Sequence, residues 1–581
     1  ITVSVTVVAA GSVSAAQART VSPTWLKVGI DGDEKYYTPY NIDGNNYFKL
    51  RDIAYALSGS SKQFDVVWNE ETSSIHLIEN QAYTPVGGEN ITENIFFQKV
   101  EHIAVPTESK LYLNGEPLEL TSYNIQGNNY FKLRDLGEAL NFSVEWNERM
   151  QKIEINTVFD YVSPDAADSY TFIRNAGINV TNKMEVNNWG SVSPLQQFAY
   201  KNEGMAYAYL QDEMLHIVTP GRHLTLESKY PLLGDVISDS KGNFYVVWGK
   251  SNETNKTDTQ TIFITKYTAD GKHTKTTGFV GKSRMGDDGN TKEPFSAGSC
   301  DSAIHDGVLM VTYARSMYNG HQSNNVVGVN TKDMSPVKFG DVWDVPYTSH
   351  SFNQRIIWSE HAQDFLYIDH GDAYDRGFMI TLQNKVKRLF HFYLEANADY
   401  NMWIVNKTFA QMGELTETGE GVVFVGASAK SIGEAAKEEK QNLFMQIFDP
   451  TKKVSSAMFT GGTQRSGKTS FDINDNKNKP LTSVTDYGVI WLTDNTERDV
   501  IAPHAVVADD RIVILWNEQI DYFRTEAFYM VVSEQGKVLT PATSLGKNLP
   551  LNSEEAPIYH DGKVYWACSY RGSIHVMDLE V

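Results

Sequence analysis

The sequence predicts a mainly β protein, with two small α/β repeat modules (ββ-β-α-ββ) followed by a seven-bladed β-propeller. Two repeats support this fold class. Tyr40–Asp52 reads YNIDGNNYFKLRD and returns 83 positions later as Tyr123–Asp135, YNIQGNNYFKLRD, with one difference in thirteen residues. After Asp160, a looser strand–turn–strand phrase recurs seven times. Near-copies of one segment indicate copies of one structural unit, so the two repeats divide the chain into a front and a back region.

Each front copy has the signals of a small α/β module. A short apolar strand meets Asp31-Gly32 or Asn114-Gly115, the residue types that type I′ hairpin turns need. A second turn, an aromatic strand and a short amphipathic helix follow, and in the second copy this helix is expected at Leu133–Leu140. A closing hairpin with one Trp ends each copy. The Tyr, Phe, Leu and Trp positions are expected to form a separate core in each module.

The repeated Tyr-Asn-Ile-x-Gly-Asn-Asn-Tyr-Phe-Lys-Leu-Arg-Asp run, the helix after it and the Val-x-Trp-Asn turn resemble the copper amine oxidase N-terminal-like domain. This domain is a repeat of secreted Gram-positive proteins, and the likeness covers roughly residues 24–156. The resemblance implies an exported protein with an N-terminal stalk or attachment unit. It implies no oxidase activity, because Asp399-Tyr400-Asn401 has the wrong order for the cofactor site and no His-x-His copper pair occurs.

The first eighteen residues are expected to be the remainder of a secretory signal. Ile1–Val13 is apolar, and Ala16-Gln17-Ala18 has the A-x-A form of a cleavage site, although an ordinary first strand is the alternative. No later run of eighteen apolar residues occurs, so no transmembrane segment is expected in the mature chain. The expected domains are a signal remnant, a first module, a linker, a second module and a propeller, at residues 1–18, 19–80, 81–104, 105–157 and 158–581.

The back region predicts a β-propeller because one phrase recurs in it: an apolar strand, a polar turn and an apolar strand that ends in an aromatic residue in six of the seven phrases. Units of roughly 40–60 residues of this kind are typical of propeller blades. The seven phrases are Phe198–Tyr209, Asp235–Trp248, Ser302–Tyr313, Arg355–Tyr367, Gln411–Val425, His504–Trp516 and Ala556–Trp566. Six or eight blades remain alternatives. A strand near Ser169–Arg174 is expected to complete the last blade, because an open ring would leave exposed sheet edges.

Composition excludes several classes of partner and cofactor. The net charge of −21 repels nucleic acid and anionic lipid surfaces. The two cysteines, Cys300 and Cys568, lie in different units and are expected to be buried thiols, too few for a thiolate zinc site. Asp472–Asn476 begins like a calcium loop, but the required Gly and Glu are absent. No metal and no cofactor are predicted.

Candidate site residues follow from the position of propeller ligands, which usually bind where the innermost strands begin. The fourth unit is the most polar there, and His350, His370 and Asp372 are candidates for acid–base chemistry. The candidate ligand-binding residues are Gln354, Asp375, Arg376, Arg315, His321 and His504. The alternative is structural, with self-satisfied turns and salt bridges between blades.

These observations predict an exported, cell-surface-associated protein whose propeller binds glycan or protein without catalysis. A propeller-type hydrolase or lyase acting on polysaccharide or peptide is the first alternative, and a purely structural envelope component is the second. The placement of the polar candidate residues in the loops discriminates between these three functions. Candidates that converge on an open pocket favour binding or catalysis, whereas candidates that are buried and paired with each other favour structure.

Overall fold

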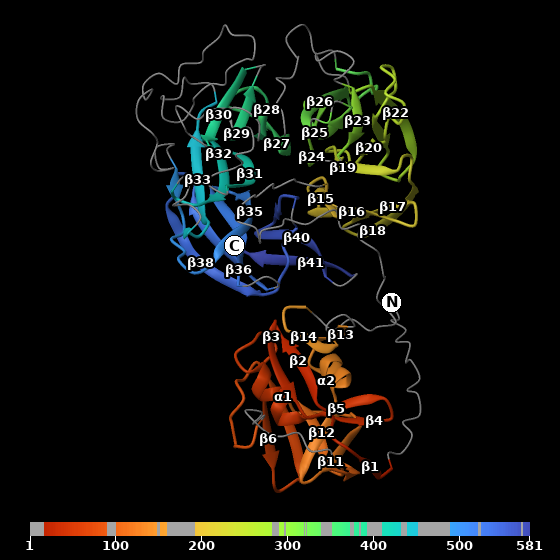
Figure 1. The fold of residues 1–581 in the computed structure, drawn as a ribbon, viewed down its shortest axis with the longest axis vertical. Coiled ribbons are helices and arrows are strands. Elements are labelled where there is room, and N and C mark those ends of the chain that lie inside the picture. The colour runs from red at the N-terminus through yellow and green to blue at the C-terminus, as the bar shows by residue number, and fades with distance from the viewer. Residues whose placement is uncertain are drawn as a thin grey trace, which may run out of the picture. The chain divides into compact units, whose positions relative to one another are not determined.

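The chain divides into two compact units, residues 1–167 and 168–581 (Figure 1). The computed structural model describes residues 17–581 except 90–99, 148–150, 160–191, 194, 282–289, 296–297, 319, 321, 338–350, 372–376, 383–384, 392–409, 432–437, 451–488, 521–523, 553 and 571–572. The apolar start of the expected signal and the expected strand near Ser169–Arg174 lie outside the described residues. No described helix has the length and apolar character needed to cross a membrane.

Unit 1 consists of three antiparallel or mixed sheets and two short helices. The first copy contributes β1 (Arg19–Val21), β2 (Leu26–Ile30), β3 (Asp33–Tyr37), β4 (Tyr40–Ile42), β5 (Asn45–Lys49), α1 (Leu50–Leu57), β6 (Phe64–Asn69) and β7 (Ser74–Glu79). The second contributes β8 (His102–Pro106), β9 (Lys110–Leu113), β10 (Glu116–Leu118), β11 (Ser122–Ile125), β12 (Asn128–Lys132), α2 (Leu133–Ala139), β13 (Ser143–Asn147) and β14 (Lys152–Asn156). The predicted order of elements within each copy is therefore present.

The two copies exchange strands. The closing hairpin of the first copy pairs through β7 with β9 of the second copy, in parallel. The closing hairpin of the second copy pairs through β14 with β2 of the first, also in parallel. Strands β5 and β12 pair antiparallel, and Phe48 stands opposite Phe131, its equivalent in the other copy. This pairing of equivalent residues marks a local two-fold relation between the copies.

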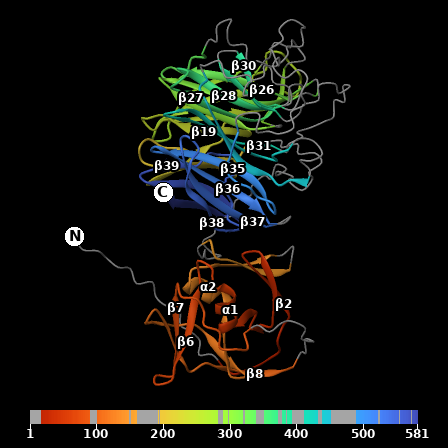
Figure 2. The ribbon, with the colours of Figure 1, turned by 90° about the vertical axis from the view of Figure 1, so that its left-hand side faces the viewer.

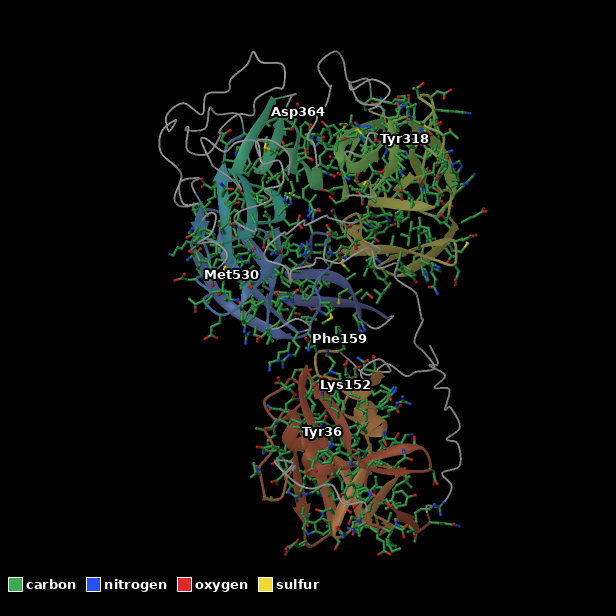
Figure 3. The ribbon with its side chains drawn as sticks, viewed as in Figure 1. Tyr36, Lys152, Phe159, Tyr318, Asp364 and Met530 are labelled. Carbon is green, nitrogen blue, oxygen red and sulfur yellow. The ribbon has the colours of Figure 1, made fainter. Side chains whose placement is uncertain are left out.

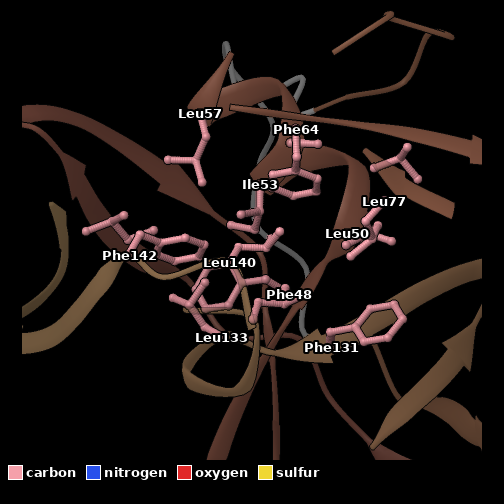
Figure 4. Close-up of a cluster of buried hydrophobic side chains, with 14 of the residues drawn as sticks. Phe48, Leu50, Ile53, Leu57, Phe64, Leu77, Phe131, Leu133, Leu140 and Phe142 are labelled. Atoms are coloured by element: carbon pink, nitrogen blue, oxygen red, sulfur yellow. The ribbon is translucent and has the colours of Figure 1, made fainter. Parts of the chain in front are cut away.

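One hydrophobic core serves both copies (Figure 4). Phe48, Ile53 and Phe64 of the first copy lie in the same buried cluster as Phe131 and Phe142 of the second. The helices supply one apolar face each, at the i, i+3 and i+4 spacing that the amphipathic pattern predicts. The expectation of a separate core in each module is wrong, because strand exchange places the closing hairpin of each copy against the other.

The tryptophans of the closing hairpins are not core residues, contrary to expectation. Trp68 is 43% exposed and its counterpart Trp146 is 41% exposed. Trp68 lies on the same strand face as the buried Phe64 and Val66, and Trp146 on the same face as Val144, but each stands one residue before the end of its strand. A large aromatic side chain on each copy therefore faces solvent.

Unit 2 consists of seven sheets in its described part (Figures 1 and 2). The first three are β15 (Leu195–Ala199), β16 (Met205–Gln211), β17 (Met214–Thr219) and β18 (Arg222–Glu227); β19 (Leu232–Ser238), β20 (Phe244–Gly249), β21 (Ile262–Tyr267) and β22 (His273–Phe279); and β23 (Thr291–Pro294), β24 (Cys300–His305), β25 (Val308–Met317) and β26 (Gln322–Asn330).

The next four sheets complete the unit. They are β27 (Ser351–Ser359), β28 (Asp364–Gly371), β29 (Gly377–Leu382) and β30 (Lys385–His391); β31 (Gln411–Thr418), β32 (Gly421–Ser428), β33 (Asn442–Phe448) and β34 (Ile490–Trp491); β35 (Asp499–Ala508), β36 (Arg511–Gln519), β37 (Thr525–Ser533) and β38 (Val538–Lys547); and β39 (Ile558–His560), β40 (Lys563–Tyr570) and β41 (Ser573–Glu580).

The seven sheets form a ring. Their first strands contact one another in chain order, β15 to β19, β24, β27, β31, β35 and β39, and β15 also contacts β40 of the last sheet. Apolar clusters fill the space between neighbouring sheets; for example, Met530 of β37 packs with Val423 and Val425 of β32 (Figure 3). Radially arranged antiparallel sheets that return to the first sheet make this unit a β-propeller. The sequence phrases correspond to the first two strands of six sheets and to β24 and β25 of the third.

Side-chain amides join the last sheet to the first. Gln197 Nε2 of β15 donates to the carbonyls of Glu555 at 3.1 Å and Ala556 at 2.7 Å, and its Oε1 accepts from Ala567 N at 2.7 Å. Asn552 Nδ2 donates to the Leu195 carbonyl at 2.9 Å. Among the described residues, the junction therefore rests on hydrogen bonds between side chains and backbone, while each sheet keeps its own strands.

Candidate functional site

The first strands of the propeller carry a chain of charged and hydroxyl side chains, here called the inner girdle. It consists of Asp235 on β19, Asp301 and Ser302 on β24, Arg355 on β27, Glu414 on β31, His504 on β35 and Glu555 before β39. Asp235, Arg355, Glu414 and His504 are each less than 8% exposed. Because the first strands contact each other around the ring, these groups form one connected electrostatic system.

Backbone irregularities accompany the girdle residues. The pairing register of the first strand shifts between Leu233 and Asp235 in the second sheet, and between Ile501 and His504 in the sixth. Comparable shifts occur beside Gln354 and within Met412–Leu415, which includes Glu414. A β-bulge inserts an extra residue and redirects a side chain out of the strict alternation of the strand. The bulges therefore allow polar groups to point between blades from strands that are otherwise apolar.

Four polar contacts of the girdle join one blade to the next. Ser302 Oγ donates to the Asp235 carboxylate, and the Ile356 backbone N–H donates to Asp301 Oδ2 at 2.8 Å. Arg355 Nε donates to Glu414 Oε2 at 3.0 Å. On its other oxygen, Glu414 Oε1 lies 2.9 Å from His504 Nδ1. The second to sixth blades are thereby linked in sequence.

Protonation differs sharply within the girdle. Burial raises the pKa of Glu414, but Arg355 and the His504 hydrogen bond outweigh burial and hold that pKa below its usual value. Burial raises the pKa of Asp235 to about 6 and that of Asp301 to about 7, despite the nearby Arg355. Burial and the Asp235 and Asp301 carboxylates raise the pKa of Glu555 well above its usual value. Glu414 is thus ionised at neutral pH, whereas Asp301 is near its midpoint there and Glu555 favours its protonated form.

In the Glu414–His504 pair, the second ring nitrogen of His504 is buried and not used in the contact with Glu414. His504 is 3% exposed, and its Nε2 has no hydrogen-bond partner among the described residues. A carboxylate at Nδ1 favours the tautomer that leaves Nε2 as an acceptor, which is the arrangement of a general base. Among the described residues, no group of three His, Cys, Asp or Glu is placed to hold a metal ion.

Of the predicted ligand-binding residues, His504 belongs to the girdle, whereas Gln354 and Arg315 have structural surroundings. The Gln354 backbone N–H donates to Ser299 Oγ at 2.7 Å, and its carbonyl accepts from Arg355 Nη1 at 3.0 Å. Arg315 is fully buried in the third sheet, where Nε donates to Ser323 Oγ and Nη1 to Thr291 Oγ1, both at 3.0 Å. Arg315 therefore fastens β23 to the centre of its own sheet.

The predicted acid–base set is only partly described. His370 is 2% exposed, its ring centroid lies 5.4 Å from that of Phe378, and burial lowers its pKa to about 3. A histidine in this state is neutral at physiological pH and cannot act there as a general acid. His350, Asp372, Asp375, Arg376 and His321 lie outside the described residues, so a role for them stays a prediction.

Sequence reasoning missed most of the girdle. Asp301 and Glu555 were singled out by their place just before a first strand but given no role, and Asp235, Arg355 and Glu414 were not singled out, although Asp235, Ser302, Arg355 and His504 each begin one of the seven phrases. Alignment of the phrases on their first residues would have shown a polar group at the same place in several units.

Cys300 and Cys568 are buried free thiols, as predicted.

Comparisons with known proteins give weak likenesses to propeller structures. The β-propeller domain of the trilobed protease from Pyrococcus furiosus has a TM-score of 0.34 and 9% identity, over 67% of this chain and 95% of that one. The tricorn protease has a TM-score of 0.36 and 10% identity, over 93% of this chain and 47% of that one. The WD40 domain of SCAP from fission yeast has a TM-score of 0.26 and 10% identity, over 69% and 95%.

Those similarities carry no argument about this chain, whose propeller rests on the contacts between its own sheets. No protein-family model matches the sequence. No curated protein matches it either.

Proposed function

We propose that this chain is an exported, cell-surface-associated recognition protein whose propeller binds glycan or protein without catalysis. In this proposal unit 1 serves as a stalk or attachment unit, as its resemblance to the copper amine oxidase N-terminal-like domain implies. The partner is an extracellular or cell-envelope glycan or protein, and nucleic acid is not expected because of the net charge of −21.

The mutual pairing of charges in the inner girdle is the observation that favours a non-catalytic protein over a hydrolase, and it suits a recognition protein and a purely structural component alike. The Glu414 carboxylate accepts from Arg355 and contacts His504, and all three side chains are buried. Hydrolysis needs an acid and a base that reach a substrate. Groups that bond each other across blades instead fix the blades in place, and a rigid ring suits a protein that presents recognition loops.

A propeller-type hydrolase or lyase is the second candidate, and a specific observation favours it. His504 Nε2 has no partner among the described residues, and Asp301, with its pKa raised to about 7, is suited to donate a proton near neutral pH. A base and an acid within one connected network are the two groups that such a reaction requires. The purely structural envelope component is the third reading.

The test uses the full chain in a glycan array, in pull-downs with isolated cell envelope and in a broad hydrolase and lyase screen. The proposal predicts saturable binding and no turnover, with binding unchanged in His504→Gln once the variant is shown to be folded. Turnover that disappears in His504→Gln would overturn the proposal in favour of the hydrolase. Absence of both binding and turnover would favour the structural component.

A further inference from the structure

Unit 1 contains a groove that is built by both repeat copies. Its volume is about 300 Å³. The lining residues are Lys49, Leu50, Arg51, Val66, Val67, Trp68 and Ile75 from the first copy, and Ser109, Asn124, Gly127, Asn128 and Asn129 from the second. Neither copy alone forms this groove, because its lining comes from both copies, which are joined by the pairing of β7 with β9 and of β5 with β12.

One wall of the groove is an exposed apolar surface. Val67 and Trp68 of β6 are 42% and 43% exposed, which is unusual for a valine and a tryptophan beside a packed core. An exposed indole in a groove offers a flat apolar face together with an N–H donor. Such a face suits the C–H side of a sugar ring, which is flat, apolar and bordered by hydroxyls.

The second copy contributes a fixed amide to the lining, that of Asn129. Asn129 Oδ1 accepts from Thr107 Oγ1 at 3.1 Å and from Asn124 Nδ2 at 3.2 Å. With its oxygen engaged in this way, the Asn129 NH2 group faces the other direction and has two N–H donors. An amide held by its oxygen is pre-organised to donate to hydroxyl or carboxylate oxygens of a ligand.

The charge of the groove is opposite to that of the chain. The net charge of the protein is −21, yet the lining residues include two cations, Lys49 and Arg51, and no carboxylate. Lys49 is partly neutralised, because Nζ lies 3.7 Å from Asp52 and donates to the Gly88 carbonyl at 2.7 Å. Arg51 Nη1 donates to Tyr83 Oη at 3.3 Å, and the remaining guanidinium donors can meet a carboxylate in bidentate fashion.

We infer that this groove binds an acidic polysaccharide. A sugar ring stacks on Trp68, a uronate carboxylate pairs with Arg51, and ring hydroxyls accept from the Asn129 amide. The inference concerns unit 1 alone and does not depend on the ligand or activity of the propeller.

The second copy supplies a matched control within the same chain. Trp146 corresponds to Trp68, is similarly exposed at 41%, and follows Glu145 where the first copy has Val67. Arg134 corresponds to Arg51. The equivalent place in the second copy therefore has a tryptophan and an arginine but also a carboxylate, which repels an acidic ligand.

The experiment measures binding of polygalacturonate oligomers to the full chain by calorimetry, with neutral cello-oligosaccharides and poly-glutamate as comparison probes. Trp68→Ala and Arg51→Ala are expected to weaken binding about tenfold or more, the effect of roughly 1.4 kcal/mol. Val67→Glu, which copies the second module at an exposed position, is expected to weaken it similarly. Trp146→Ala and Arg134→Ala are expected to change affinity less than about twofold.

Thermal unfolding of each variant confirms that loss of binding is not loss of fold. Binding of polygalacturonate that is lost in the first-copy variants and retained in the second-copy variants supports the inference. Three results would overturn it: no binding of polygalacturonate, equal losses in the two sets of variants, or poly-glutamate binding as tightly as polygalacturonate. The last result would show attraction to charge without recognition of sugar.

Discussion

Unit 1 and unit 2 both consist of repeats, but the two copies in unit 1 share a thirteen-residue run with one difference, whereas the seven in unit 2 share only a loose pattern. In unit 1, equivalent residues face each other, as Phe48 faces Phe131, so both copies experience the same environment. In unit 2, the equivalent places on the inner strands hold unlike residues with unlike contacts: Asp235 and Ser302 bond each other, whereas Arg355 and His504 bond the two oxygens of Glu414. Repeats remain alike where they contact their equivalents, and they differ where they contact non-equivalent partners.

The largest expected effect comes from breaking the girdle in unit 2. Glu414→Ala leaves Arg355 buried without its carboxylate and is expected to reduce the free energy of unfolding by about 3–5 kcal/mol. Denaturant unfolding of the full chain, followed by near-UV circular dichroism, measures the loss. The double variant Arg355→Met/Glu414→Met removes both charges and is expected to recover most of the stability. A single variant as stable as the unmodified protein would contradict the proposed role of this pair.

A second change tests the shared core of unit 1. Phe48→Ala is expected to destabilise the unit by about 3–5 kcal/mol, because a buried aromatic side chain is replaced by a cavity. Hydrogen exchange should show lost protection in β12 and β14 of the second copy as well as in the first. Phe131→Ala, its counterpart, is expected to give the same pattern. Protection that persists in the second copy after Phe48→Ala would mean that the copies fold independently.

The smallest expected effect is a change in how the stability of unit 2 depends on pH, because Glu555 lies near other buried carboxyl groups. The pKa of Glu555 is raised in the folded state, so the folded chain binds more protons than the unfolded chain as pH rises above about 4.3. This difference makes stability fall with increasing pH. Glu555→Gln removes this pH-dependent loss of stability. The free energy of unfolding of the variant minus that of the unmodified protein is therefore expected to increase from pH 4 to pH 9. A relative stability that decreases over this range would show that Glu555 is stabilised as a carboxylate.

The sequence predicted the order of elements better than the contacts between them. The hairpin turn at Asn114-Gly115 is present, with φ angles of 50° and 90°. It was predictable because Asn and Gly readily adopt the positive φ that a type I′ turn requires at both central residues. The seven phrases were recognisable because the period of a strand and the chemistry of a turn are local properties. The exchange of β7 and β14 between copies could not be predicted, since identical modules can close on themselves or on each other with the same local pattern.

The candidate site was harder to predict for the same reason. His504 was identified from its place at the start of a phrase, but its partner Glu414 lies 90 positions earlier, in the preceding blade. The raised pKa values of Asp235 and Asp301 depend on burial, and that of Asp301 also on the nearby Asp235 carboxylate, which spacing in the sequence does not encode. Polar His370 looked suitable for chemistry, whereas burial keeps it neutral.

The reciprocal pairing of β7 with β9 and of β14 with β2 has a consequence for the length of such arrays. The closing hairpin of each module pairs with a strand of the other module. With two modules both closing hairpins are paired, and this exchange leaves no pairing position for a third module. Longer arrays built in this way would contain modules in pairs, and a single isolated module would be expected to form a dimer.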